Sequence, residues 1–139
     1  MSSARPRTVV LDTEAVAAAS RNEPGMRARL AAARRNEQRV VVPAIVLAEL
    51  ITGKPTDARV WQVLRRLPTI DTTGAMAAQA GALREQVEPV RRKKRDLTVD
   101  AVVAAVATAL QPSVIVTADT DNHRLLTAGH DVKVASTNP

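Results

Sequence analysis

Short runs of β-branched residues alternate with longer alanine-rich segments along this chain. The short runs have the composition of buried strands, whereas the longer segments carry apolar residues at the spacing of an α-helix. Strands that alternate with helices predict a three-layer α/β/α fold, in which helices cover both faces of a central, mostly parallel sheet of four to five strands. The predicted strands cover residues 8–11, 39–42, 69–71, 114–117 and 132–135.

The helical segments between these strands carry recognisable end signals. Pro43 suits the first position of a helix, because the first N–H groups of a helix have no partner within it. Asp57 and Asp96 each stand where a side chain can cap the helix that follows, and Gly129 can end the last helix. The predicted helices cover residues 14–20, 26–35, 43–52, 58–66, 73–87, 97–109 and 121–127.

The length and composition indicate one domain over residues 1–139, without an internal repeat. The chain has no cysteine, which excludes disulfides and thiolate metal sites and fits a reducing compartment. No apolar run approaches the ~20 residues of a membrane span, and no long apolar segment follows the charged N-terminus as it would in a secretory signal. We therefore expect a soluble, cytoplasmic protein without a membrane partner.

The chain carries 20 Lys and Arg against 14 Asp and Glu, which gives a formal net charge of +6. That balance suits a polyanionic partner such as RNA, although plain solubility is the alternative explanation. Trp61 is the only aromatic residue, which excludes recognition of RNA by stacked aromatic platforms. Nucleic acid would instead be held by Arg and Lys on its phosphates.

The densest group of cations lies in a predicted basic loop at residues 89–96. Because the predicted helix that contains Asp100 follows directly, this loop could lean over bound RNA and neutralise its phosphates. The alternative is a solvated loop without a ligand. The candidate RNA-binding residues are Arg91, Arg92, Lys93, Lys94 and Arg95.

Four carboxylates stand at the ends of, or inside, the most apolar segments of the chain: Asp12, Glu49, Asp100 and Asp119. Acids in such surroundings are costly unless positive charge meets them, and a divalent metal ion is the obvious candidate. Mg²⁺ and Mn²⁺ prefer such oxygen ligands. Asp12 and Asp119 each follow a predicted strand, so both belong at the carboxyl edge of a parallel sheet, where functional residues gather.

Each acid also has a purely structural interpretation, which the sequence leaves open. Asp12 and Asp119 stand where they could cap the helices that follow their strands. Asp100 lies in the first turn of a predicted helix, where the helix dipole favours an acid. Glu49 has apolar neighbours on nearly every helical face, so we do not expect a purely solvated side chain, and a buried ion pair is the competing explanation.

The arrangement of these acids resembles the PIN domain, and in particular the VapC-type ribonuclease toxins of bacterial type II toxin–antitoxin systems. Each motif is short, but their order and spacing match the family nearly end to end. The matching segments are VVLDT at 9–13, VPAIVLAEL at 42–50, TVDAVVAA at 98–105 and VTADTD at 116–121. The resemblance implies a single PIN domain over residues 1–139, with endoribonuclease activity that depends on Mg²⁺ or Mn²⁺.

The family's catalytic acids match Asp12, Glu49, Asp100 and Asp119, and the resemblance implies that these residues also hold the metal. Asp12 and Asp100 would bind it directly. Glu49 and Asp119 would position water, bind a second ion or act through outer-shell contacts. Thr117 matches the small hydroxyl residue that supports the last acid by hydrogen bonding.

Two positions depart from the family's pattern or vary within it. Glu14 stands where the family often has Ser or Asn, and we expect its side chain to point outward rather than toward the metal. The last motif varies among members of the family. Asp121 is therefore a candidate to share or replace part of the role of Asp119 as a metal ligand.

The implied reaction is hydrolysis of RNA phosphodiester bonds, in which metal-activated water attacks the phosphorus in line and leaves 5′-phosphate and 3′-hydroxyl ends. The implied partners are the RNA substrate, a cognate antitoxin protein and a second copy of the chain in a homodimer. Trp61 is expected to pack among apolar neighbours or to lie at one of these protein interfaces.

Three other functions compete with this hypothesis. A PIN-like module that binds RNA or a partner without cutting would share the fold, but the complete set of acids argues against it. A haloacid-dehalogenase-like phosphatase would want a second aspartate two residues after Asp12, where Glu14 stands. A metal-independent ribonuclease would need a histidine pair, and nothing in the spacing brings His123 and His130 together.

Overall fold

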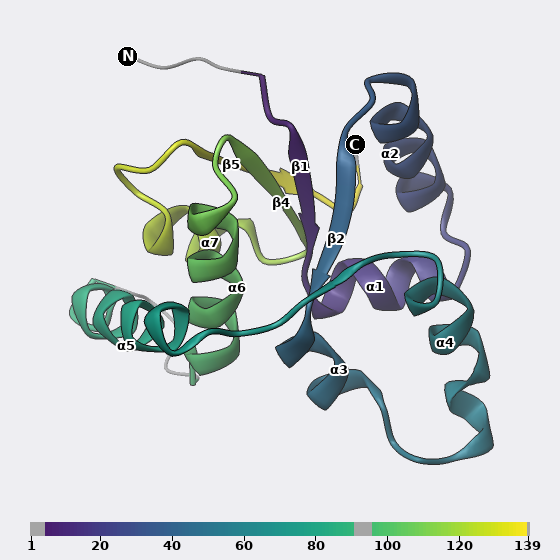
Figure 1. Cartoon of the computed structure of the whole chain (residues 1–139), viewed down its shortest axis with the longest axis horizontal. Helices are drawn as coiled ribbons and strands as arrows, with labels where there is room; N and C mark the ends of the chain where they lie inside the picture. Colours follow the sequence, from purple (N-terminus) through teal and green to yellow (C-terminus); the bar gives the residue numbers. More distant parts are fainter. Residues whose placement is uncertain (1–4, 91–95, 139) are drawn as a thin grey trace.

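A sheet of five parallel strands, in the order β3-β2-β1-β4-β5, forms the centre of the molecule (Figure 1). The structure is a computed structural model that describes residues 5–90 and 96–138. The observed sheet confirms the predicted parallel arrangement and strand number. The strands are β1 (Thr8–Leu11), β2 (Arg39–Pro43), β3 (Thr69–Ile70), β4 (Ser113–Thr117) and β5 (Val132–Ser136).

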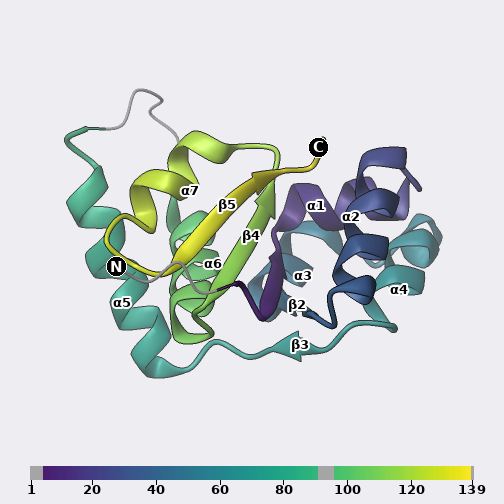
Figure 2. The ribbon, with the colours of Figure 1, turned by 90° about the horizontal axis from the view of Figure 1, so that it is seen from above.

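Helices cover both faces of this sheet, which confirms the three-layer prediction. Figure 1 and Figure 2 show α1, α2 and α4 gathered on one side and α5, α6 and α7 on the other. α3 lies beyond the carboxyl end of β2, where it contacts both α1 and α6. The helices are α1 (Thr13–Ser20), α2 (Pro24–Arg35), α3 (Ala44–Leu50), α4 (Ala58–Leu64), α5 (Gly74–Val87), α6 (Thr98–Ala109) and α7 (Thr120–Leu126), with a 3₁₀ turn at Pro55–Asp57.

β1 lies in the middle of the sheet and is buried on both of its faces. Val10 pairs with Val41 on one side and with Ile115 on the other. Val10 and Leu11 are both 0% exposed, although their side chains point to opposite faces. A strand enclosed in this way needs apolar residues at every position, which explains a continuous apolar run in place of strict alternation.

α6 is enclosed on nearly all sides. Its residues from Ala101 to Thr108 are all buried. The helix packs against the sheet on one side and against α5 and α7 on the other, so its apolar residues are not confined to one stripe. No helix within the described ranges is both long and apolar enough to cross a membrane.

The residues predicted to mark the starts of two helices, Pro43 and Asp96, were each wrong by one position. Pro43 is the last residue of β2, because it still pairs with β3, and α3 begins at Ala44. α6 begins at Thr98 with Leu97 as its N-cap, whereas Asp96 lies one residue earlier and accepts a hydrogen bond from the Thr98 N–H at 3.0 Å. The other boundaries differ from the predicted ones by no more than two residues.

Asp57 occupies the predicted N-cap position of α4, but its side chain makes no capping hydrogen bond, so the predicted role of the carboxylate was wrong. Its carboxylate is buried and turns back toward the loop that follows α3. There it accepts hydrogen bonds from the Thr52 hydroxyl at 2.8 Å and from the Gly53 N–H at 2.7 Å. The Asp57 carboxylate therefore closes the loop between α3 and α4 instead of capping the first N–H groups of α4.

Two helices are followed, within two residues of their ends, by a residue in the left-handed conformation that glycine favours. Asn22 follows α1 with a φ of 57°, and Glu37 follows α2 with a φ of 56°. After α2, the Gln38 N–H donates to the Ala33 carbonyl at 2.9 Å. The Glu37 N–H donates to the Arg34 carbonyl at 3.1 Å, which completes a Schellman motif. Because asparagine tolerates this conformation better than glutamate, Glu37 carries the larger backbone strain.

Replacing Glu37 by glycine should raise the free energy of unfolding by about 1 kcal/mol, because glycine adopts a positive φ without the penalty of an L side chain. Urea unfolding followed by circular dichroism measures this change. Glu37→Ala is the matched control, since it removes the side chain but keeps the penalty. A Glu37→Gly protein that is no more stable than Glu37→Ala would contradict the assignment of strain.

Burial raises the pKa of Asp57, but hydrogen bonds from the Thr52 hydroxyl and from the N–H groups of Gly53, Thr52 and Lys54 outweigh it, so the pKa lies below 3.8. Such a group stabilises the fold above its unfolded pKa, and this stability is lost as the pH falls through the folded pKa. Asp57→Asn should therefore lower the urea midpoint at pH 7, with a difference from wild type that shrinks below pH 3.8. Asp71→Asn, at an exposed acid, should leave the midpoint unchanged. A difference that is constant with pH would rule out this role of the charge.

Candidate active site

The candidate site lies at the carboxyl ends of β1 and β4, which are neighbours in the sheet. Leu11, the last residue of β1, pairs with Val116 of β4. The Asp12 N–H then continues the ladder by donating to the Val116 carbonyl at 3.3 Å. Asp119 follows the end of β4 by two residues. The structure therefore places Asp12 and Asp119 at the same edge, as their positions after predicted strands indicated.

Asp12 is buried, with 5% of its surface exposed, and both of its carboxylate oxygens face a partner. Oδ1 accepts a hydrogen bond from the Ala15 N–H at 2.9 Å, which caps α1. Oδ2 lies 3.4 Å from Nε2 of His123. The structural and the functional interpretations of Asp12 are therefore compatible, because different oxygens serve them.

Asp100 comes from a distant part of the chain and faces the same histidine. It lies in the first turn of α6, and its Oδ1 is 3.7 Å from Nε2 of His123. Its side chain is 17% exposed, so it lies at the border between the core and solvent. The contact of α6 with α7 thus brings Asp100 toward Asp12, a convergence that the sequence suggested only through family resemblance.

His123 is the residue of this site that the sequence interpretation missed. It is fully buried on α7, whereas His130 is exposed in the turn after that helix, so the two do not form a pair. Neither ring nitrogen of His123 has a hydrogen-bond partner among the described residues. The available signal was its position one helical turn after Asp119, which places both residues on one side of α7.

Asp119 is the N-cap of α7 and is held by Asn122. Its Oδ1 accepts from the Asn122 N–H at 3.5 Å and its Oδ2 accepts from the Asn122 side-chain amide at 2.9 Å. The buried Thr117 hydroxyl accepts from the Asp119 N–H at 2.9 Å, which is the kind of support that the resemblance implied. Asp121, by contrast, has a side chain that is 94% exposed and lies 3.9 Å from Arg124. This geometry favours Asp119 over Asp121 as the fourth acid.

Glu49 lies near the end of α3 and is exposed, which contradicts the expectation that its side chain would not be purely solvated and excludes the alternative of a buried ion pair. The Thr13 hydroxyl donates a hydrogen bond to its Oε1. Because Thr13 directly follows Asp12, this bond ties the end of α3 to the start of α1 beside the other acids. Glu14 is exposed, in agreement with the expectation that its side chain points outward.

The acids fit a cation that keeps part of its water shell. Within residues 5–90 and 96–138, no three Asp, Glu or His side chains lie close enough to hold a metal ion between them. Mg²⁺ usually takes only one or two carboxylates directly and completes its shell with water. Asp12 and Asp100 are two carboxylates from different parts of the chain that approach the same histidine nitrogen, so their number and chemistry suit such an ion.

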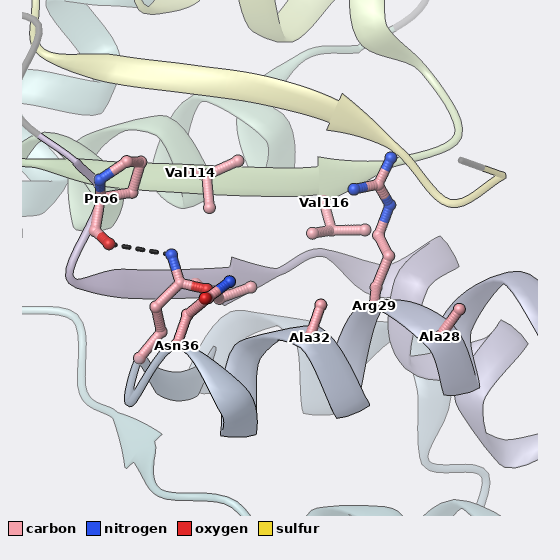
Figure 3. A pocket seen from close by; sticks show the side chains of 9 residues that line it. Pro6, Ala28, Arg29, Ala32, Asn36, Val114 and Val116 are labelled. Carbon is pink, nitrogen blue, oxygen red and sulfur yellow. Dashed lines mark hydrogen bonds between the residues drawn. The ribbon is translucent and has the colours of Figure 1, made fainter.

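A pocket of about 320 Å³ lies between α2 and the strands β1 and β4 (Figure 3). Val114 and Val116 lie on its sheet side, and Ala32 faces it from α2. Arg29 points along the pocket and donates a hydrogen bond to the Ser136 carbonyl. None of the four acids lines this pocket, so it is separate from the candidate site.

A larger hollow of about 790 Å³ lies among α1, α2 and α4. Its apolar lining includes Leu30, Val63 and Leu67. Arginines that form no ion pair with any acid in the described part of the chain surround this lining, so the hollow suits an anionic partner with an apolar face. These arginines are Arg27, Arg34, Arg39, Arg59 and Arg66. The predicted RNA-binding cations lie outside the described residues; they are Arg91, Arg92, Lys93, Lys94 and Arg95.

A family model described as PIN domain matches residues 9–126. The fold is similar to a chain of VapBC2 from Rickettsia felis bound to a promoter DNA fragment, with a TM-score of 0.70, 19% identity and coverage of 93% of this chain and 98% of that one. It is also similar to DNA-bound VapBC from Salmonella typhimurium, with a TM-score of 0.69, 20% identity and coverage of 94% of this chain and 98% of that one. A chain of a toxin–antitoxin complex from Klebsiella pneumoniae is similar as well, with a TM-score of 0.65, 17% identity and coverage of 89% of this chain and 94% of that one. No curated protein sequence matches the chain.

Asp12→Ala should lower the free energy of unfolding by about 1 kcal/mol, because α1 loses its cap. Asp12→Asn should lose less, since its side-chain oxygen can still accept from the Ala15 N–H. Urea unfolding of both variants, without added metal, separates the cap from the charge. Equal losses in the two variants would show that the hydrogen bond to Ala15 does not stabilise the helix.

Proposed function

The chain belongs to the PIN domain family, and from this premise we propose that it is a metal-dependent endoribonuclease and the toxin of a toxin–antitoxin pair. The observation that carries the proposal is the approach of Asp12 and Asp100 to one histidine nitrogen, at 3.4 and 3.7 Å, at the carboxyl edge of the sheet. Two acids held together at such an edge suit the binding of a divalent cation and a phosphate.

In the proposed mechanism, Asp12 and Asp100 would hold Mg²⁺ or Mn²⁺. A cation bound there would neutralise charge that develops on the scissile phosphate and make water a stronger nucleophile. The carboxylate of Asp12 is oriented in advance, because its Oδ1 is fixed by the Ala15 N–H. Preorganisation of this kind matters because a misplaced acid contributes little to the transition state.

Glu49 and Asp119 are proposed to act on water and not as the main ligands. Glu49 is exposed and is steadied by the Thr13 hydroxyl, so it can accept a proton from water that attacks the phosphorus. Asp119 is held by Asn122 and by its own backbone contact with Thr117, which suits an outer-shell role. The products would be a 5′-phosphate and a 3′-hydroxyl end.

An antitoxin is the proposed protein partner, and the hollow among α1, α2 and α4 is its proposed binding surface. The arginines around that hollow would meet acidic side chains, and Leu30, Val63 and Leu67 would meet apolar ones. The half-buried Trp61 of α4 packs against the core and can extend this apolar surface. Assembly of the chain as a homodimer is part of the same proposal.

Incubation of the purified protein with total cellular RNA should yield cleavage with Mg²⁺ or Mn²⁺ and none with a chelator. Asp12→Asn and Asp100→Asn should each lower the rate at least 100-fold, because loss of one group that stabilises transition-state charge costs on the order of 3 kcal/mol. Gel electrophoresis and mapping of the cut ends provide the measurement.

Glu14→Gln is the matched control, since it removes an exposed carboxylate only two residues from Asp12 and should retain the wild-type rate. Cleavage that persists in chelator would exclude the metal mechanism. Binding of Mn²⁺ without cleavage of any RNA would instead favour a PIN module that binds without cutting.

A further inference from the structure

His123 is a buried polar side chain whose hydrogen-bonding capacity is unused. It is 0% exposed, and neither Nδ1 nor Nε2 has a hydrogen-bond partner among the described residues. A buried polar group without a partner is costly and rare, so its presence calls for a physical reason. The orientation of the imidazole ring suggests such a reason, because Nε2 faces the carboxylates of both Asp12 and Asp100.

The two carboxylates that flank His123 repel each other, and each raises the cost of the other's charge. An N–H group between them offsets this repulsion, since it can donate to either oxygen. The distances of 3.4 and 3.7 Å exceed those of a formed hydrogen bond, about 2.7–3.2 Å, by a small margin. Shortening both distances by a few tenths of an ångström, with the N–H directed at the oxygens, would complete the two contacts.

The two acids differ in how far they are buried. Asp12 is fixed at Oδ1 by the Ala15 N–H and is almost fully buried. Asp100 lies at the border with solvent, with a side chain that is 17% exposed, on the first turn of α6. His123 thus faces one carboxylate that is almost fully buried and one at the border with solvent.

We propose that His123 is a positioning residue whose Nε2–H holds the carboxylates of Asp12 and Asp100 at a fixed separation. The proposal deepens the proposed function, since its purpose is to prepare both acids for a divalent cation. A ring nitrogen that donates its proton to carboxylates cannot also coordinate a metal, so His123 acts through the acids. Groups that orient metal-binding carboxylates in this way typically contribute 10–100-fold to metal affinity.

Two variants separate the N–H donor from the volume of the ring. His123→Leu fills a similar space without a donor, whereas His123→Gln can place an amide N–H close to the position of Nε2. Isothermal titration with Mn²⁺ should show a 10–100-fold weaker affinity for His123→Leu and an affinity within about threefold of wild type for His123→Gln. Circular dichroism confirms that each variant is folded.

A double-mutant cycle tests the same contact without any metal. Asp100→Asn should raise the urea midpoint more in the His123→Leu background than in the wild-type background, because only the former leaves two acids without a shared donor. Absence of coupling would overturn the proposal, even if the wild-type protein binds Mn²⁺. Conversely, a wild-type protein that shows the coupling but binds no Mn²⁺ would support the positioning role and contradict the proposed metal mechanism.

Two further results would overturn the positioning role. Equal losses of Mn²⁺ affinity in folded His123→Leu and His123→Gln would show that ring packing, and not the N–H, sustains the site. A different visible absorption spectrum of bound Co²⁺ in His123→Gln would show that the ring is itself a metal ligand. An unchanged spectrum, together with retained affinity, supports the positioning role.

Discussion

The enclosure of β1 between β2 and β4, with helices against both of its faces, fixes the position of nearly everything else in the molecule. Its side chains are excluded from water on both sides, so the strand cannot slip in register without exposing apolar residues or burying polar ones. The ladder runs one residue past the strand, to the Asp12 N–H. The backbone of Asp12 is therefore held in place by the sheet, and Asp12 is the fixed position from which the other acids of the site can be described.

The architecture and two of the four acids could be predicted from local patterns. The alternation of β-branched and alanine-rich segments indicates a parallel sheet. In such a sheet, a residue that directly follows a strand lies at the edge formed by the carboxyl ends of the strands. Asp12 and Asp119 were located in this way. Asp100 and Glu49 lie on helices, and the direction in which a helix points depends on tertiary packing that no local pattern contains. Their placement came from the family resemblance.

The errors have specific physical causes. Asp57 satisfies the pattern of a helix cap, but its carboxylate accepts hydrogen bonds from the N–H groups of the preceding loop instead of those of the helix. Glu49 stands in an apolar segment, where a purely solvated side chain was not expected, yet α3 lies at the end of the sheet, where one side of the helix meets solvent. His123 was missed because the carboxylates that it faces, Asp12 after β1 and Asp100 in α6, lie far from it in the sequence.

The short helix α7 connects two parts of the site that would otherwise be independent. Asp119 begins this helix and His123 lies one turn later, so the carboxylate that starts the helix also determines where the imidazole is presented. One helical turn rises about 5.4 Å, and this rise sets the separation along α7 between Asp119 and the histidine that faces Asp12 and Asp100. A change in the length or direction of this first turn would therefore move His123 relative to the carboxylates of Asp12 and Asp100.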